Sequence, residues 1–226
     1  MNQTLKTILT IVVVVLVIYW IYKFFTKDTI SLSSLKPANV EEHIDADKLP
    51  NNNSNNFAYS MWFYVSDWNY RFGSKKIILH RMGKDGGSCP SVSLGATEND
   101  IDITLATMKG DSTCSVANVP IQKWVNLIIS VNGRSLDVYI DGKLVRTCLL
   151  PGIAKVNTNG DCFITPDGGF SGYTANFQGF NKPVNPQEAY NIYKAGFGGS
   201  SLANLFKYHL RIELLENSNV KGQVTI

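Results

Sequence analysis

The sequence has little surplus charge of either sign. Its 226 residues include 21 Lys and Arg against 18 Asp and Glu. Three lysines and one aspartate give residues 1–30 a net charge of +2, which leaves +1 of the total +3 for residues 31–226. A near-neutral domain has no field strong enough to concentrate a phosphate backbone or an anionic substrate. Nucleic acid is therefore not an expected partner.

The sequence also lacks the spacings of two common catalytic sites. Its three histidines, His43, His80 and His209, lie in separate segments, and no two stand at metal-ligand spacing. No serine stands in a Gly-x-Ser-x-Gly motif, which marks the nucleophile of the α/β-hydrolases. Neither a zinc site nor a hydrolase triad is predicted, and we expect the histidines to be surface or structural residues.

One carboxylate pattern is compatible with an enzyme. Glu98, Asp100 and Asp102 alternate in the segment ENDID, and alternate residues of a strand project to one face. Retaining glycosidases use such paired carboxylates as nucleophile and acid. Ile101 and Ile103 alternate on the opposite face, which is equally typical of an ordinary strand with a solvated acidic edge. We favour the second interpretation and expect no enzymatic activity.

A metal cofactor has equally little support. Calcium takes about six to eight oxygen ligands. Asp67, Asn69 and Asp85 offer such oxygens, but their positions in the sequence also fit loop-capping residues. We expect no cofactor and keep Ca²⁺ as an alternative.

One long apolar run is present, at the N-terminus. Residues 7–22 read TILTIVVVVLVIYWIY and contain no charge. At about 1.5 Å of rise per residue they nearly cross a hydrocarbon core of roughly 30 Å. The run ends in aromatic rather than small residues, unlike a cleaved signal peptide. We expect residues 1–28 to form a single-pass membrane anchor, and its predicted residues include Ile8, Val12, Val15, Trp20 and Tyr22.

A polar segment follows the apolar run. Residues 29–56 end in the Asn-rich stretch PNNNSNN and have few apolar side chains with which to form a core. We expect them to be a spacer and the entry to a domain over residues 57–226.

Residues 57–226 contain many short apolar segments. Most are rich in β-branched and aromatic residues and are separated by Gly, Pro, Asn and Asp. This pattern predicts an all-β sandwich. One short helix is predicted over residues 186–196, with Pro at its start and Gly at its end. A closing hairpin is predicted near the C-terminus.

Residues 123–148, KWVNLIISVNGRSLDVYIDGKLVRTC, predict a three-stranded meander with one buried face. Asn132-Gly133 and Asp141-Gly142 fit the central positions of type I′ turns. The turns predict these apolar cross-strand pairs: Ile129 with Leu136, Leu127 with Val138, and Val138 with Val145.

Four cysteines allow three full pairings. Cys89 with Cys114 and Cys148 with Cys162 would suit sequential hairpins. Four reduced, buried thiols are the alternative, so the disulfide state stays open.

The densest aromatic segment is a candidate ligand site. Trp62, Tyr64, Trp68 and Tyr70 lie within nine residues of one another. Exposed rings stack on sugar faces or fill a partner's pocket, because they offer a large contact area with few rotors. Core packing is the alternative, since aromatic residues of strands are often buried.

Two segments resemble a known family. WVNLIISVNGRSLDVYIDGKL at residues 124–144 and GGFSGYTANFQGFNKPVNPQEAY at residues 168–190 resemble laminin G-like, concanavalin A-like domains. The resemblance implies that the sandwich is a jelly roll of two packed antiparallel sheets. The segment YSMWFYVSDWNYRFGSKKIIL at residues 59–79 is similar to membrane-anchored proteins of large DNA viruses. The fold alone does not choose a function.

Two functions fit these expectations. The first is a non-enzymatic, membrane-anchored structural module, a minor capsid-associated protein that tethers an internal membrane to the protein shell. Its partners would be membrane lipid and capsid or other virion proteins. The alternative is a glycan-binding adhesion module of the laminin G type.

Overall fold

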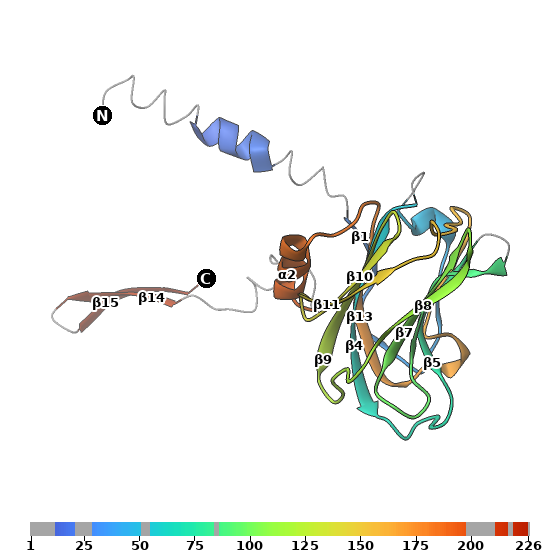
Figure 1. The fold of residues 1–226 in the computed structure, drawn as a ribbon. Helices are drawn as coiled ribbons and strands as arrows, with labels where there is room; N and C mark the ends of the chain where they lie inside the picture. The colour runs from blue at the N-terminus through green and yellow to red at the C-terminus, as the bar shows by residue number, and fades with distance from the viewer. Residues whose placement is uncertain are drawn as a thin grey trace.

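The computed structural model describes residues 12–20, 29–50, 55–83, 86–197, 211–216 and 219–225. Two antiparallel sheets pack face to face (Figure 1). The strands of the first sheet, in spatial order, are β1 (Thr29–Ser33), β13 (Ser171–Phe180), β4 (Phe57–Asp67), β9 (Trp124–Asn132), β10 (Ser135–Ile140) and β11 (Lys143–Leu149). The short β2 (Lys36–Pro37) also pairs with β13.

The second sheet has six strands. In spatial order they are β3 (Glu42–Ile44), β12 (Cys162–Ile164), β5 (Lys76–Met82), β6 (Ser88–Leu94), β7 (Ile101–Thr107) and β8 (Gly110–Val116). Two 3₁₀ helices, η1 (Ala46–Lys48) and η3 (Pro166–Gly168), lie in the connections. β14 (Arg211–Glu216) and β15 (Asn219–Thr225) pair with each other, which confirms the predicted hairpin.

The core lies between the two sheets. Alternate residues of β4, from Phe57 to Val65, and of β9, from Val125 to Val131, are buried there. They face Ile101, Ile103 and Leu105 of β7, none of which has exposed surface. Full burial of such a side chain stabilises a fold by about 1.5–3 kcal/mol. The period-two pattern of the sequence thus produces the predicted sandwich.

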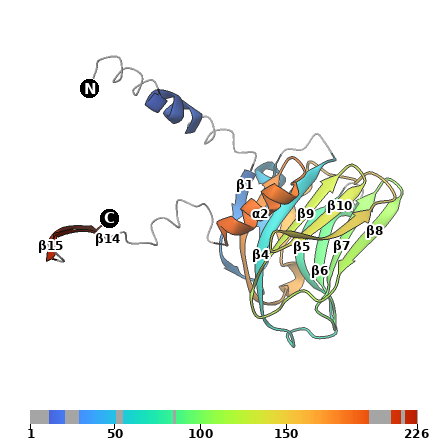
Figure 2. The same ribbon diagram turned by 60° about the vertical axis from the view of Figure 1, so that its left-hand side comes forward.

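The helix α2 (Pro186–Ala195) covers part of the outer face of the first sheet (Figure 2). Asn185 caps it, and Glu188 completes the capping box. A second apolar cluster forms beneath the helix, and its buried members are Ala58, Ile128, Tyr139, Phe180, Val184 and Ala189. The helix predicted over residues 186–196 is therefore confirmed.

The meander is confirmed, but its register differs from the prediction. Leu136 pairs with Val131, and Val138 pairs with Ile129, because the turn is centred one residue later, on Gly133 and Arg134. This moves the pairing by two residues, so the same side chains still face the core.

The second pairing of the meander contains a bulge. Ile140 and Lys143 pair as predicted, but the register then shifts and Val138 meets Arg146. The predicted pair Val138–Val145 was therefore wrong, and Val145 is 46% exposed. An extra residue in one strand redirects the side chains that follow it.

Strand pairing extends into the range that the sequence predicts as a spacer. β1 and β2 pair with β13, and β3 pairs with β12. Within residues 29–56, segments that are short and polar thus add to both sheets through backbone hydrogen bonds.

The predicted anchor is described only in part. Residues 12–20 form a helix whose side chains are all at least half exposed, from 50% at Val12 to 66% at Trp20. Within the described residues, no helix combines the length and the apolar composition needed to cross a membrane. Ile8 and Tyr22 lie outside the described residues, and Val15 lies within the helix. The anchor over residues 1–28 stays a prediction.

The disulfide differs from the pairing that sequential hairpins would give. Cys114 of β8 is bonded to Cys148 of β11, and Cys89 and Cys162 are buried free thiols. β5 separates the two free cysteines, because Cys162 pairs with Arg81 and Cys89 lies on the strand beyond. Two strand spacings amount to about 10 Å, which exceeds the roughly 7 Å that a disulfide spans.

Candidate functional site

Three loops at one end of the sandwich meet around a pocket. They connect β4 to β5 (68–75), β6 to β7 (95–100) and β8 to β9 (117–123). Three backbone hydrogen bonds hold them: Gly73 N to Ala96 O at 2.9 Å, Val119 N to Asn99 O at 2.8 Å, and Gln122 N to Val65 O at 2.9 Å. The loops are therefore fixed to one another and to β4.

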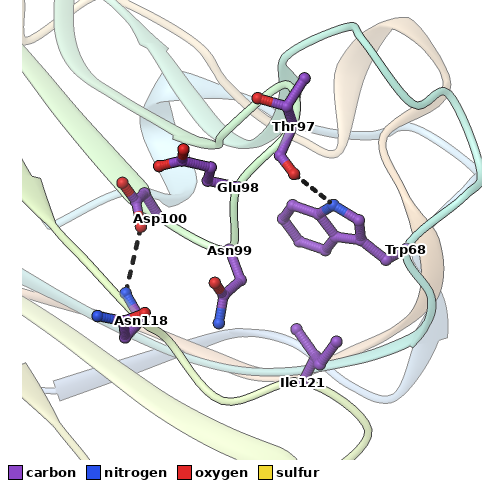
Figure 3. A pocket seen from close by; sticks show the side chains of 7 residues that line it. All are labelled: Trp68, Thr97, Glu98, Asn99, Asp100, Asn118 and Ile121. Carbon is purple, nitrogen blue, oxygen red and sulfur yellow. Dashed lines mark hydrogen bonds between the residues drawn. The ribbon is translucent and has the colours of Figure 1, made fainter.

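The pocket encloses about 440 Å³ (Figure 3). Trp68 and Ile121 form one side, and Asp100 and Asn118 lie opposite. Its complete lining is Trp68, Thr97, Glu98, Asn99, Asp100, Asn118 and Ile121. An aromatic ring facing convergent carboxylates and amides is typical of a site for a polar ligand with an apolar face.

Hydrogen bonds orient three of the seven lining side chains. Trp68 donates from Nε1 to the carbonyl of Thr97 at 3.2 Å, and Asn99 donates from Nδ2 to the carbonyl of Val119 at 2.9 Å. Asp100 accepts from the backbone N–H of Asn118 at 3.2 Å. Each of these groups is pre-positioned, which lowers the entropy that a ligand must overcome on binding.

A buried lysine supports the indole of Trp68. The Nζ atom of Lys76 lies 4.4 Å from the ring centroid, a cation–π contact. Lys76 is 1% exposed, and within the described part of the chain Nζ has no hydrogen-bond partner. Burial, with a smaller effect of Arg71, lowers the pKa of this lysine. Lys76 does not line the pocket, so it holds the ring without filling the space in front of it.

The four predicted aromatic residues do not form one patch. Trp62, 5% exposed, and Tyr64 lie on the outer face of the first sheet. Trp68 lines the pocket, and Tyr70 donates its hydroxyl to the carbonyl of Gly168 at 3.0 Å. Alternation along β4 sends Trp62 and Tyr64 outward, whereas Trp68 follows the end of the strand.

The three predicted carboxylates are also divided. β7 begins at Ile101, so Glu98 and Asp100 belong to a loop and only Asp102 lies on the strand. The expected alternation of all three along one strand was therefore wrong. Asp102 forms an ion pair with Lys75 at 2.7 Å and accepts from Ser115 at 2.6 Å.

These contacts determine the ionisation of Asp102. Partial burial by itself raises its pKa, but the hydrogen bonds from Lys75 and Ser115 and the charge of Lys75 outweigh burial, so the pKa is lowered. Asp102 is therefore held as a carboxylate and is unsuited to act as a general acid at neutral pH.

The residues of the alternative calcium site are not assembled in the described part of the chain. Asp67 accepts from the backbone N–H of Asn69 at 2.9 Å, which is a loop-capping contact, and Asp85 lies outside the described residues. Where the structure describes the chain, no three His, Cys, Asp or Glu residues are grouped as metal ligands.

The histidines have structural contacts where they are described. His43 is 3.0 Å from a carboxylate oxygen of Asp161 and stacks on Phe163. His80 lies 3.4 Å from the hydroxyl of Ser88. His209 lies outside the described residues.

Four lining residues were not predicted from the sequence: Thr97, Asn99, Asn118 and Ile121. The only sequence signal was the polar composition of their loops. Asn118 adopts a left-handed backbone with φ of 58°, a conformation that asparagine tolerates better than most residues.

A second hollow of about 510 Å³ lies beside η1. It is lined by Ala46, Asp47, Leu49, Thr158 and Asn159 and contains no aromatic side chain. Without a ring or a second charge it offers fewer groups for recognition than the Trp68 pocket.

Comparison with known proteins supports the fold. A family model described as the concanavalin A-like lectin/glucanases superfamily matches residues 39–189. No protein with a curated description matches the sequence significantly.

Solved structures with a similar fold include three structures of botulinum neurotoxin binding domains, two of serotype D and one of serotype G. The serotype D binding domain has a TM-score of 0.56 and 16% identity, over 74% of this chain and 41% of that chain. The serotype G binding domain has a TM-score of 0.52 and 16% identity, over 74% and 46%. The serotype D ligand binding domain in complex with N-acetylneuraminic acid has a TM-score of 0.55 and 16% identity, over 74% and 41%. The chain thus spans less than half of the length of these structures, and the likeness concerns the fold alone.

Proposed function

Because the chain belongs to the concanavalin A-like lectin/glucanases superfamily, we propose that it is a carbohydrate-binding module and that the Trp68 pocket is its site. The observation that carries the proposal is the placement of the Trp68 indole opposite Asp100 and Asn118 in one open pocket. A pyranose has apolar C–H faces and a rim of hydroxyls, and this pocket offers a surface for each.

The binding geometry follows from the lining. The indole of Trp68 covers one face of a sugar ring, and Ile121 extends the apolar contact. Glu98 and Asp100 accept hydrogen bonds from hydroxyls, and bonds to a charged acceptor are about twice as strong as neutral ones. The side-chain amides of Asn99 and Asn118 can both donate and accept. Glu98 forms no hydrogen bond with other described residues, so its carboxylate can turn toward a ligand.

The charge of the pocket predicts its specificity. Its lining contains two carboxylates and no cationic side chain. A sialylated sugar would bring a third negative charge into the same space, which is unfavourable. We therefore expect neutral oligosaccharides to bind better than sialylated ones, although one structure with the same fold is a complex with N-acetylneuraminic acid.

The test uses the full chain and a fixed set of sugars: cellotetraose, maltotetraose, chitotetraose and sialyllactose. Calorimetry measures the binding of each sugar to the wild type, to Trp68→Ala and to Glu98→Gln. We expect the wild type to bind at least one of the neutral sugars. We expect Trp68→Ala to weaken binding at least fivefold, because stacking of a ring on an aromatic side chain contributes on the order of 1–3 kcal/mol.

Phe72→Ala is the matched control. Phe72 is in the same loop, is 57% exposed and does not line the pocket, so its loss should leave affinity unchanged. If no sugar binds the folded wild type, or if Trp68→Ala binds as well as Phe72→Ala, the pocket is not a carbohydrate site.

A second function, attachment to a membrane, is favoured by the N-terminal helix. Every side chain of residues 12–20 is apolar or aromatic and at least half exposed. Burial of these side chains in lipid would remove that surface from water. We propose that residues 1–28 anchor the module to a membrane. A structural tether role, with capsid or other virion proteins as partners, stays a prediction.

Flotation with phosphatidylcholine vesicles tests the anchor. The full chain should float with the vesicles, and a variant with Val12→Lys and Val15→Lys should remain in the dense fraction. Equal sedimentation of both proteins would exclude an anchor in this segment.

A further inference from the structure

Three aromatic side chains form a row across the outer face of the first sheet. Tyr173 of β13 pairs with Tyr64 of β4, and Tyr64 pairs with Trp124 of β9. Neighbouring strands are about 4.8 Å apart, so the aromatic row spans roughly 10 Å. Tyr173 is 46% exposed, and the rings of Tyr64 and Trp124 are half-buried.

Phe197 lies on one end of the aromatic row. Its ring is parallel to that of Trp124, with a centroid distance of 4.7 Å and an interplanar angle of 10°. It also meets Trp62 edge-on, with centroids 6.0 Å apart. A parallel ring over a tryptophan is the position in which a planar ligand stacks.

Phe197 belongs to no helix or strand. It follows the end of α2 by two residues and is 42% exposed. In the described part of the chain its side chain is held by ring contacts with Trp62 and Trp124, so it can leave the aromatic row without unfolding a strand.

Two polar atoms beneath this layer lack partners. Trp62, stacked under Tyr193, is 5% exposed, and its Nε1–H makes no hydrogen bond to any described residue. Its cross-strand neighbour Asn126 has no exposed surface, and the Oδ1 atom of Asn126 accepts no hydrogen bond from any described residue. An unpaired buried polar group is unfavourable, and a phenyl ring has no group to offer it.

We propose that the aromatic row is a second saccharide-binding surface and that Phe197 occupies it in the unbound protein. A sugar ring would take the place of the phenyl ring over Trp124. Its hydroxyls would reach the unpaired donor of Trp62, which the phenyl ring cannot satisfy. The ligand class rests on the proposed carbohydrate function, but the surface is separate from the Trp68 pocket.

The contact of Phe197 with the row makes binding there competitive. The aromatic contact of Phe197 stabilises the state in which its phenyl ring covers the row. This reduces the apparent affinity of an external ligand roughly five- to tenfold. Removal of the phenyl ring should raise the apparent affinity by the same factor. The protein would thus present one open site and one site that a ligand must uncover.

The test measures binding of cellotetraose, maltotetraose and chitotetraose by calorimetry to full-chain variants. Phe197→Ala should bind at least one of them at least fivefold more tightly than the wild type, or with one additional site. The gain should persist in Phe197→Ala combined with Trp68→Ala, and disappear in Phe197→Ala combined with Trp124→Ala. Phe197→Tyr, which keeps a ring, should show no gain.

The possible failures are distinguishable. If wild-type protein binds no sugar but Phe197→Ala does, the Trp68 pocket fails and the aromatic row stands. If Phe197→Ala gains nothing with any of the three sugars, or if its gain survives Trp124→Ala, the aromatic row is not a covered site. Thermal unfolding of each variant confirms that it is folded, and Trp124→Phe replaces Trp124→Ala if the latter is not.

Discussion

Cys114 and Cys148 join the two sheets at their edges. Cys114 lies on β8, the last strand of the second sheet, and Cys148 lies on β11, the last strand of the first. Most of β11 is exposed, so it contributes little to the core. The disulfide therefore holds an edge strand that apolar packing alone secures poorly.

Reduction of this disulfide should destabilise the protein by about 4 kcal/mol. The two cysteines are separated by 34 positions, and the crosslink restricts the unfolded chain accordingly. Urea unfolding with and without reductant measures the difference. The double variant Cys114→Ala/Cys148→Ala should unfold like reduced wild type and should not respond to reductant. If reductant leaves the urea midpoint of the wild type unchanged, that result would contradict a disulfide between Cys114 and Cys148.

The two free thiols should be unreactive in the folded protein. Burial raises the pKa of Cys89 and of Cys162 to about 12, although the charge of Arg81 acts in the opposite direction. The reactive thiolate is therefore scarce at pH 8. Mass spectrometry after iodoacetamide treatment should find no alkylation in the native state, two modified cysteines after denaturation and four after reduction as well. Rapid alkylation of native protein would disprove the burial.

Replacement of Arg81 should be strongly destabilising. Arg81 is 1% exposed, and its guanidinium donates to the hydroxyl of Tyr59 and to the carbonyls of Asn157 and Gly160. Arg81→Lys lacks the planar fork that reaches all three acceptors, so we expect a loss of about 2–4 kcal/mol in the free energy of unfolding.

Tyr59→Phe is the matched comparison for Arg81→Lys. It removes one acceptor and should lower the free energy of unfolding by only about 1–2 kcal/mol. Chemical denaturation of both variants provides the measurement. Equal stability of Arg81→Lys and wild type would show that the buried network is dispensable.

The contribution of Asp102 should depend on pH. Its pKa is lowered from 3.8 in the folded protein, so the unfolded chain binds more protons just below that value. The stabilisation is complete above pH 5 and is lost as the pH falls through about 4 and below. Asp102→Asn should reduce stability by about 0.5–1 kcal/mol at pH 6, since Lys75 is well exposed, and by little at pH 2.

Asp111→Asn is the control for this pH dependence. Asp111 is exposed on the neighbouring β8, and its replacement should alter stability by less than about 0.5 kcal/mol at either pH. If Asp102→Asn lowers stability equally at pH 6 and pH 2, the ionised carboxylate of Asp102 does not stabilise the folded protein.

The meander illustrates how far a sequence pattern reaches. Alternation from Val125 to Ile140 correctly predicts which side chains enter the core, since a strand has a period of two residues. It does not distinguish a turn on Asn132-Gly133 from one on Gly133-Arg134, because both keep the same parity. The hydrogen bond from Gly133 N to the side chain of Asn56, 77 positions away, forms only in the folded protein.

The candidate site was less predictable than the fold. Trp68 and the carboxylates Glu98 and Asp100 were identified separately from the sequence, with no indication that they share a pocket. The amide side chains of Asn99 and Asn118 were not identified, because polar loop residues are common and carry no periodic pattern.

The sequence by itself determined the all-β class, the buried faces of the strands, the helix at residues 186–195 and the C-terminal hairpin, because local periodicity and capping residues specify them. Only the tertiary structure decided the pairing of Cys114 with Cys148, the separation of Trp62 from Trp68 and the position of Phe197 over Trp124. These relationships join residues far apart in the chain, and their distances depend on how two sheets and their loops pack rather than on any local pattern.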